Sequence, residues 1–403
     1  MTAAQAHNPD IRVDLDAFAR EVEALRAELD EARGPECRTH LRKMERWGRA
    51  CTALGYATAW LGPNPVSVAA LSLGRTARWT MIAHHVSHRG YDKVPGMPQR
   101  LTSRGFARGR RRLLDWLDWI EPEAWNQEHN LQHHYNLGED PGDPDLVQRN
   151  LDWLRESSLP DPLKVALVAF YMGTWKPFYY APSTTVQLHE ARARRIARKN
   201  KSEPESVGWI WNPLSKPGRD LVLKSWLFYG GVTFGAIPVL FAPLGPLAVG
   251  SVAINSALAE VVTNVHTFII ITTNHTGDDL PVFEEERHGG RAEFYIRQIA
   301  GSVNFRTGGD LNDFLHGWLN YQIEHHVWPD LTMRQYRLAQ PRLKALCEKY
   351  GVPYLQESVW TRLRKTVRVM IGRDTQRLHT IRDLNPPEAP PNADEPQLSY
   401  GAR

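Results

Sequence analysis

Three short histidine clusters, separated by long stretches of chain, constrain what this sequence can fold into more than any other feature. They are His84-His85-Val-Ser-His88, His129-Asn-Leu-Gln-His133-His134 and Gln322-Ile-Glu-His325-His326. Imidazole is the commonest metal ligand in proteins, and these histidines outnumber the three or four protein ligands of a single zinc site. One such cluster would as readily be a solvated surface feature, but three together predict a fold that brings them to one site with two metals.

Spacing within the clusters supports a binuclear site. Residues four apart lie on one face of a helix, so His84 and His88, and likewise His129 and His133, can each offer two nitrogens to one metal. Adjacent residues on a helix point about 100° apart. The pairs His133-His134 and His325-His326 can therefore divide between two neighbouring metals.

The residues around the clusters resemble a known family. Trp125-Asn-Gln-Glu-His129 leads into the second cluster, an acidic run from Asp140 to Leu146 follows it, and Leu319 to Pro329 contains the third. The sequence resembles the membrane fatty acid desaturases, whose signature is three histidine boxes ending in His-or-Gln-x-x-His-His, over roughly residues 45 to 345. The resemblance implies two iron atoms that activate dioxygen, the co-substrate, and remove two hydrogens from adjacent carbons of an acyl chain.

The resemblance also implies a set of metal ligands, namely His84, His88, His129, His133, His134, His275, His325 and His326. The family usually needs one ligand near the end of its last transmembrane helix, and His275 occupies that place. The alternative is that His275 is only a polar residue capping a helix end. Where many relatives have Asp, this chain has His85, so the assignment between His84 and His85 stays open.

His266 lies nine residues before His275. At 1.5 Å per residue this is about 13 Å along a straight helix, too far for the two to share a metal. We expect Asn264 and His266 to line a polar pocket or to pair with one another, because a polar group inside a bilayer needs a partner.

Further residues are candidates for a supporting or additional role. Each ligating imidazole needs an acceptor for its second ring N–H, which fixes the tautomer. Acidic residues near the boxes can supply it or can simply be solvated, and Gln322 stands where a histidine often does. The candidates are His85, Gln322, Asp143, Asp145, Glu324, Asp330 and Asn274.

Overall composition hides two apolar segments. A mean hydropathy of -0.45 and 23% charged residues suit a soluble enzyme. Ser225 to Phe241 and Leu244 to Thr272, however, each approach the roughly 20 residues that span a bilayer. They contain Glu260 as their only charge and predict a transmembrane hairpin, with buried core helices as the alternative.

An earlier apolar stretch is broken by Gly62-Pro63-Asn64-Pro65. Trp47 to Leu61 and Val66 to Ala83 predict a second hairpin, or a re-entrant loop. We therefore predict a mainly α integral membrane protein with about four transmembrane helices in two hairpins and a cytoplasmic helical cap that holds a di-iron site. Because each hairpin returns to the side that it left, all boxes lie on one face.

Basic residues flank the apolar segments on the side of the boxes, in the stretches 42–49, 104–112 and 192–201. The positive-inside rule makes that side cytoplasmic, with both termini there. Leu163 to Tyr180, interrupted by Lys176-Pro177, is predicted to lie at the membrane interface; a spanning helix there would reverse the topology. The first residues lack a secretory pattern, and Cys37, Cys51 and Cys347 form no paired framework.

The chain divides into four predicted parts. Residues 1–45 contain an amphipathic helix from Asp14 to Arg33 whose apolar positions recur every three or four residues, which favours packing on the cytoplasmic domain over a partner helix. Residues 46–345 form the desaturase-like membrane domain. Residues 346–382 form a helical segment, and 383–403 are a proline-rich, acidic tail predicted to be disordered.

Removal of hydrogen from an unactivated methylene requires a redox metal, which excludes zinc and favours two iron ions. Without a fused cytochrome b5 or rubredoxin-like segment, we expect a separate ferredoxin or cytochrome-type electron donor with its reductase, and no nucleic-acid partner. The cluster Arg104 to Arg112 suits a phosphate-bearing head group, coenzyme A, acyl carrier protein, an acidic ferredoxin or anionic lipid. The alternatives are a lipid hydroxylase with the same metals and a zinc-dependent membrane hydrolase or receptor-like protein.

Overall fold

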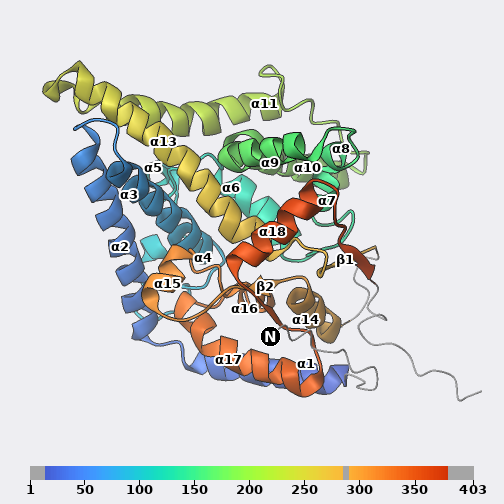
Figure 1. Ribbon diagram of the computed structural model, residues 1–403. Coiled ribbons are helices and arrows are strands. Elements are labelled where there is room, and N and C mark those ends of the chain that lie inside the picture. Colours follow the sequence, from blue (N-terminus) through green and yellow to red (C-terminus); the bar gives the residue numbers. More distant parts are fainter. Residues whose placement is uncertain (1–13, 285–289, 380–403) are drawn as a thin grey trace, which may run out of the picture.

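The computed structural model describes residues 14–284 and 290–379, so the predicted tail at 383–403 lies outside the described residues. The predicted mainly α architecture is confirmed. The strands form two small parallel pairs: β1 (Pro281–Phe283) with β4 (Arg377–His379), and β2 (Val303–Asn304) with β3 (Leu355–Gln356). Helices surround a central region that holds the histidine-bearing segments (Figure 1).

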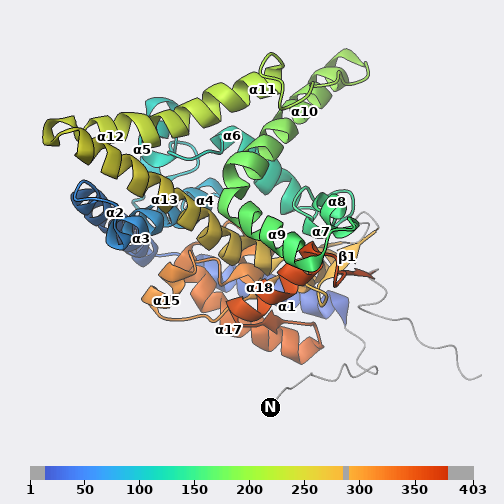
Figure 2. The same cartoon turned by 45° about the horizontal axis from the view of Figure 1, so that its top comes forward.

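Two helices are long and apolar enough to cross a membrane, Lys216–Val239 and Pro246–Asn274. The first consists of α11 (Lys216–Asp220), π-helical η6 (Leu221–Ala236) and α12 (Ile237–Val239); the second consists of α13 (Pro246–Ile271) and η8 (Thr272–Asn274). They run as the predicted hairpin, with α12 and α13 meeting at one corner (Figure 2). Only 22% of the most apolar stretch of the first helix is buried, which argues against a core helix of a soluble protein.

A second helical hairpin lies beside α13. It pairs α2 (Pro35–Ala59) with α3 (Pro65–Thr76), which continues through π-helical η1 (Ala77–Ala83) into α4 (His84–Ser87) (Figure 1). Gly55 permits the close approach, because a Cβ there would lie 2.6 Å from Cγ of Leu71. The helix α2 begins well before the predicted Trp47 and crosses the predicted boundary at residue 45. Its first half is polar, so α2 is not one of the two helices that are long and apolar enough to cross a membrane.

The run predicted to lie at the interface is one continuous helix. It comprises α9 (Asp161–Trp175), η5 (Lys176–Tyr180) and α10 (Ala181–Asn200), and α9 packs against α13. The predicted interruption at Lys176-Pro177 is a π-helical turn, a winding often found at functional sites. The ammonium of Lys176 is buried, pairs with Asp118 and lies 4.0 Å from the ring centre of Trp79.

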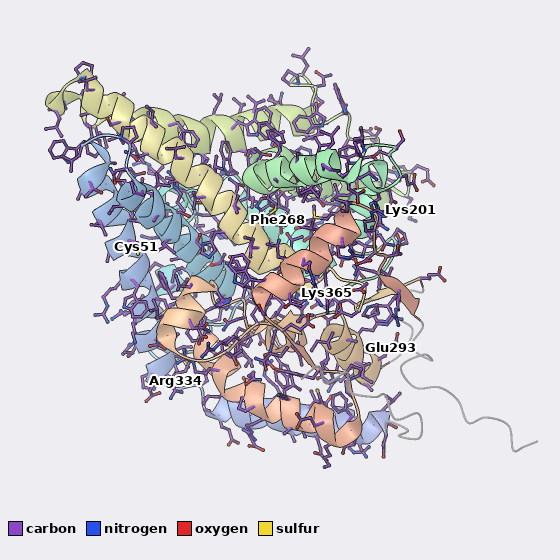
Figure 3. All side chains as sticks on the ribbon, in the orientation of Figure 1. Cys51, Lys201, Phe268, Glu293, Arg334 and Lys365 are labelled. Carbon is purple, nitrogen blue, oxygen red and sulfur yellow. The ribbon has the colours of Figure 1, made fainter. Side chains whose placement is uncertain are left out.

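Below these helices lies a helical cap. The predicted amphipathic helix is confirmed as α1 (Leu15–Glu31); it packs against α17 (Met333–Tyr350) through buried Phe18, Val22, Leu25 and Leu29. Figure 3 shows α18 (Val359–Met370), which carries Lys365, beside the end of α13 beyond Phe268. The cap also contains α14 (Arg291–Ala300), α15 (Asp310–Leu315) and α16 (Gln322–Val327).

Short helical segments complete the described chain. They are η2 (Gln99–Leu101), η3 (Gly109–Arg111), α5 (Arg112–Asp115), α6 (Pro122–Trp125), π-helical η4 (Asn126–His133), α7 (Val147–Asn150), α8 (Asp152–Arg155) and η7 (Ala242–Leu244). The segments α4, η4 and α16, which carry the three boxes, meet between the long helices and the cap, so the fold brings the clusters together.

Candidate metal centre

Eight buried or nearly buried histidines form two neighbouring groups. In each group the side-chain donor atoms lie within 4.8 Å of one another; the first holds His84, His88, His129, His134 and His325, and the second holds His133, His275 and His326. The adjacent pairs of the second and third boxes divide between the groups. The donor atoms of His129, His133 and Asp145 also lie within 4.8 Å of one another. Because His129 belongs to the first group and His133 to the second, these two residues lie where the groups adjoin.

Helix winding positions these rings. The π-helical turns η1 and η4 precede His84 and span His129 to His133, and such wider turns occur frequently at functional sites. The Nε2 atoms of His84 and His129 lie 3.2 Å apart. Two nitrogens bound to one metal at about 2.0–2.1 Å are separated by about 3 Å, so this distance suits two ligands of one ion.

Several inward nitrogens lack a protein partner. The Nε2 atoms of His88, His134, His325 and His326 are buried without a hydrogen bond. An unsatisfied buried polar atom costs about 1–3 kcal/mol. Metal ions remove that cost for the whole set at once, so the residues present fit a pair of ions.

The outward nitrogens are held by acceptors from other elements. The Nδ1 atoms of His133, His275, His325 and His326 lie 2.9–3.1 Å from, in that order, Oδ1 of Asp143, the carbonyl oxygen of Gly301, the hydroxyl of Tyr336 and Oε1 of Gln298. These contacts fix the ring orientation and leave Nε2 to face a metal, although Nε2 of His275 lies 2.8 Å from Nε2 of Gln322. Tyr336 lies on α17 and Gln298 on α14, and no spacing in the sequence predicts that they contact the histidines.

Seven of the eight imidazoles have a lowered pKa, which favours the neutral form. Burial, helped by the neighbouring histidines, holds the pKa of the five rings in the first group and of His326 well below the ordinary value. Burial lowers the pKa of His275 to about 3. For His133, burial acts downward but the carboxylate of Asp143 outweighs it, and the net pKa is raised. Neutral imidazole is the form that binds metal.

The structure separates His84 from His85. His84 belongs to the first group, whereas His85 belongs to neither and its Nδ1 lies 3.1 Å from the carbonyl oxygen of Met81. Gln322 lies at the second group, with its Nε2 2.8 Å from Nε2 of His275. Asn274 turns away and donates to the carbonyl of Leu319.

His266 lies outside both groups, and its Nε2 is 2.7 Å from the carbonyl oxygen of Leu315. The predicted pairing of Asn264 with His266 is wrong. Asn264 instead accepts from the backbone N–H of Lys176 and donates to Glu260, because it faces α9 while His266 faces α15.

Two of the four candidate carboxylates reach the histidines. Asp143 contacts His133, and Asp145 joins the combination with His129 and His133. Glu324 instead accepts from Asn304 and Tyr354, and Asp330 pairs with Arg26 at 2.7 and 2.8 Å. The expected supporting role of these last two is not supported by their contacts.

Glu128, which the sequence reasoning passed over, lies beside the second box. It accepts from the hydroxyl of Tyr180 at 3.0 Å, and burial together with Asp145 raises its pKa well above the ordinary value. Burial raises the pKa of Asp145 to about 6. For Glu128, the only signal in the sequence is its position directly before His129.

A cavity that encloses about 870 Å³, including space open to solvent, adjoins the histidine groups. It contacts four histidines, one of them His275, and its other walls are mainly apolar or aromatic: Trp79, Trp125, Val147, Leu151, Tyr171, Trp175, Tyr179, Tyr180, Ile271, Leu319 and Met370. Apolar walls with few polar groups at one place are typical of a site for a hydrophobic ligand.

Comparison with known proteins decides the family. The fatty acid desaturase model matches residues 58–358, three quarters of the chain and all three boxes. The chain belongs to the fatty acid desaturase family. The desaturase is therefore an oxidoreductase, and the resemblance drawn from the histidine boxes is confirmed.

Individual relatives are distant. The desaturase is 25% identical over 387 residues to an NADPH-dependent stearoyl-CoA 9-desaturase of Mycobacterium tuberculosis, covering 91% of this chain and 81% of the relative. It is 29% identical over 275 residues to an acyl-lipid (7-3)-desaturase of Rebecca salina, covering 64% of this chain and 55% of the relative. A Delta(8)-fatty-acid desaturase of Euglena gracilis is 34% identical over 102 residues, 24% of this chain and 22% of the relative.

Proposed function

We propose that the desaturase is a dioxygen-dependent, non-haem di-iron enzyme that introduces a double bond into an acyl chain carried by a lipid or a thioester. The observation that carries the proposal is the pair of buried histidine groups beside an apolar cavity. The names of the relatives, stearoyl-CoA and acyl-lipid desaturases, supply the substrate class.

The first iron would be held by the five-histidine group and the second by His133, His275 and His326. Iron supplies the redox chemistry with dioxygen that zinc lacks. Gln322 would complete the second site. Its Nε2 lies beside Nε2 of His275, and a flip of the amide would put Oε1, an oxygen that can bind a metal, in that place. The cavity holds the acyl chain so that a methylene pair lies beside His84, His129 and His133.

Lipid analysis of a host that expresses the chain tests this function. We expect a lipid whose mass is lower by two hydrogens, because desaturation removes them from adjacent carbons. Purified protein should contain two irons per chain. Gain of one oxygen instead would favour the hydroxylase, and stoichiometric zinc in an active preparation would contradict both oxidative functions.

Asp143 is proposed to orient His133. Replacing Asp143 with Asn should lower activity or iron affinity by about 10–100-fold, because an amide cannot hold the imidazole as the carboxylate does. The matched control is Asp310→Asn, which alters an acidic residue that pairs with Lys43 and Arg337 and contacts no histidine of either group. Iron titration and turnover should separate the two variants; equal losses would contradict the assignment.

We infer the topology from hairpin parity. In addition to the two membrane-length helices, α2 and α3 are proposed to enter the bilayer, which gives four helices in two hairpins, and α9 is proposed to lie at the interface. In this topology, residues 46–345 are proposed as the membrane domain, and the three other predicted parts, 1–45, 346–382 and 383–403, lie in the cytoplasm. Exposed apolar Leu240, Leu244 and Leu247, at the turn that joins α12 to α13, support burial of that hairpin in lipid.

Cysteine labelling tests this topology. A cysteine at Gly245 should react with a membrane-impermeant maleimide added to intact cells, because the tip of the hairpin lies on the far side. A cysteine at Lys201, in the turn after α10, should react only after the cells are opened. The reverse pattern would show that the boxes face outward.

A further inference from the structure

A second opening reaches the histidines independently of the acyl cavity. It is a broad cleft, enclosing about 1750 Å³, that contacts His88, His134 and His326. The acyl cavity contacts His84, His129, His133 and His275. The two openings share no histidine, and each reaches members of both groups, so the metal centre separates them.

The cleft differs from the cavity in chemistry. Polar and charged side chains line much of it, and its wall includes the exposed apolar residues Leu131 and Tyr135, with 53% and 55% of their surface accessible. The cleft also contains apolar residues, but it is wider than the acyl cavity and carries more charged side chains, so it shields an acyl chain from water less well. A small apolar patch within a polar rim is typical of a transient protein interface.

The charge of the rim is positive. Arg89 is exposed and forms no ion pair with residues 14–284 or 290–379, and the side chain of Arg291 on the same rim is 77% exposed while pairing with Glu23. Among the described residues that line the cleft, the acidic one is Asp330, and it pairs with Arg26. Burial raises the pKa of Asp330, but the hydrogen bond and charge of Arg26, with Arg33 and Lys93 nearby, outweigh it and lower the pKa.

Arg89 is held in an unusual backbone conformation. Its φ of 66° lies in the left-handed region, where a residue other than glycine stores strain, and such strain gathers at functional sites. The turn also packs closely against the chain just after the third box, because a Cβ on Gly90 would lie 2.6 Å from the carbonyl oxygen of Leu331. The tight turn places a cationic side chain directly beside ligand His88.

The proposed function requires electrons from outside the chain. Dioxygen takes four electrons to become two waters: two come from the two C–H bonds that break to form the double bond, and two come from a carrier. The two C–H hydrogens and two protons from water complete the balance. A carrier that delivers one electron at a time must dock twice per turnover, which calls for a weak, rapidly exchanging interface.

We propose that this cleft, lined by Arg89, Leu131, Tyr135 and Arg291, is the docking surface for a small electron-transfer protein with an acidic face. This inference rests on the proposed function. Docking here places the redox group of the carrier beside the imidazoles of His88, His134 and His326, while the acyl chain occupies the separate cavity. The alternative basic cluster at 104–112 is less suitable, because none of its residues lines either of the two openings that reach the histidines.

Binding of an acidic plant-type [2Fe–2S] ferredoxin to the full chain in lipid nanodiscs tests the surface without relying on turnover. We expect wild type to bind at low ionic strength and to lose affinity as salt rises. The double variant Arg89→Glu, Arg291→Glu should bind on the order of tenfold more weakly, with a flatter salt dependence. Arg89→Lys should retain binding, and so should Arg198→Glu, which reverses an exposed charge on α10. The same ranking should hold for metal-depleted protein, because the rim does not include the ligands.

A second measurement separates docking from catalysis. Ferredoxin-driven turnover should fall in the double variant, whereas a single turnover driven by dithionite should be unchanged. A bulky maleimide on Leu131→Cys should block only the ferredoxin-driven reaction. The proposal is overturned if wild type does not bind the ferredoxin, if the double variant binds normally, or if Arg198→Glu weakens binding equally. Absence of product from dithionite-reduced wild type would instead contradict the desaturase function and leave the binding comparison intact.

Discussion

Replacing His84 with Ala should abolish double-bond formation and lower the iron content below two per chain, whereas replacing the adjacent His85 with Gln should leave both irons in place. His84 offers its Nε2 3.2 Å from that of His129 within the five-histidine group. Its loss removes a ligand that no nearby side chain replaces, because His85 hydrogen-bonds to the carbonyl of Met81 on another face of the helix. We expect the activity of the His84 variant to fall by at least about 100-fold, more than is typical when a residue behind a ligand is lost.

The comparison is sharp because both residues are buried neighbours on α4. Iron per chain is measured on purified protein, product by lipid mass spectrometry, and folding by the fraction of protein extracted from membranes as a monodisperse species. Both variants should extract like wild type. If His85→Gln loses iron while His84→Ala keeps it, the first box uses its second histidine and the geometry of the first group is misassigned.

Much of the centre follows from the sequence because its spacing is local. The division of His133-His134 and of His325-His326 between two groups follows from the angle between neighbouring residues on a helix. The amphipathic helix α1 and the hairpin around Leu240 to Gly245 follow from apolar periodicity, from run length and from the Pro/Gly turn. These features depend on residues close together in the chain.

Other parts depend on contacts between distant segments. Gln298 and Tyr336 support His326 and His325 from separate helices, so the sequence gives no spacing to recognise. The choice between His84 and His85 depends on the π-helical turn before them, which alters which face meets the other boxes. Glu324 directly precedes His325 and looked equally suitable as a partner, yet the helix directs it toward Asn304 and Tyr354.

The separation of the two openings is likewise a property of the folded chain. The same boxes contribute to both, since His84 meets the cavity and His88 meets the cleft. One box therefore faces the acyl chain with one residue and the solvent side with another. Under the proposed function, this arrangement would keep the electron carrier out of the apolar cavity while the carrier and the acyl chain both reach the two histidine groups.

The second large effect is expected at His275, the ligand that directly follows the last long helix. Replacing His275 with Ala should reduce iron toward one per chain and nearly eliminate product. The second group has three histidines, so the change removes a third of its imidazole ligands, and Gln322 loses the ring that its amide contacts at 2.8 Å. The remaining ligands, His133 and His326, cannot close a site that normally needs at least three protein ligands.

His266 provides the matched control on the same helix. Its Nε2 lies 2.7 Å from the carbonyl oxygen of Leu315, outside both histidine groups, so His266→Ala should cost about 1 kcal/mol of stability and keep both irons. Turnover of this variant can fall through loosened packing of α13 on α15, but iron content separates the two cases. Restoring a nitrogen ligand with exogenous imidazole should recover part of the iron in His275→Ala and change nothing in His266→Ala. If iron instead survives in the His275 variant and is lost in the His266 variant, the last long helix is displaced by about two turns relative to the metals.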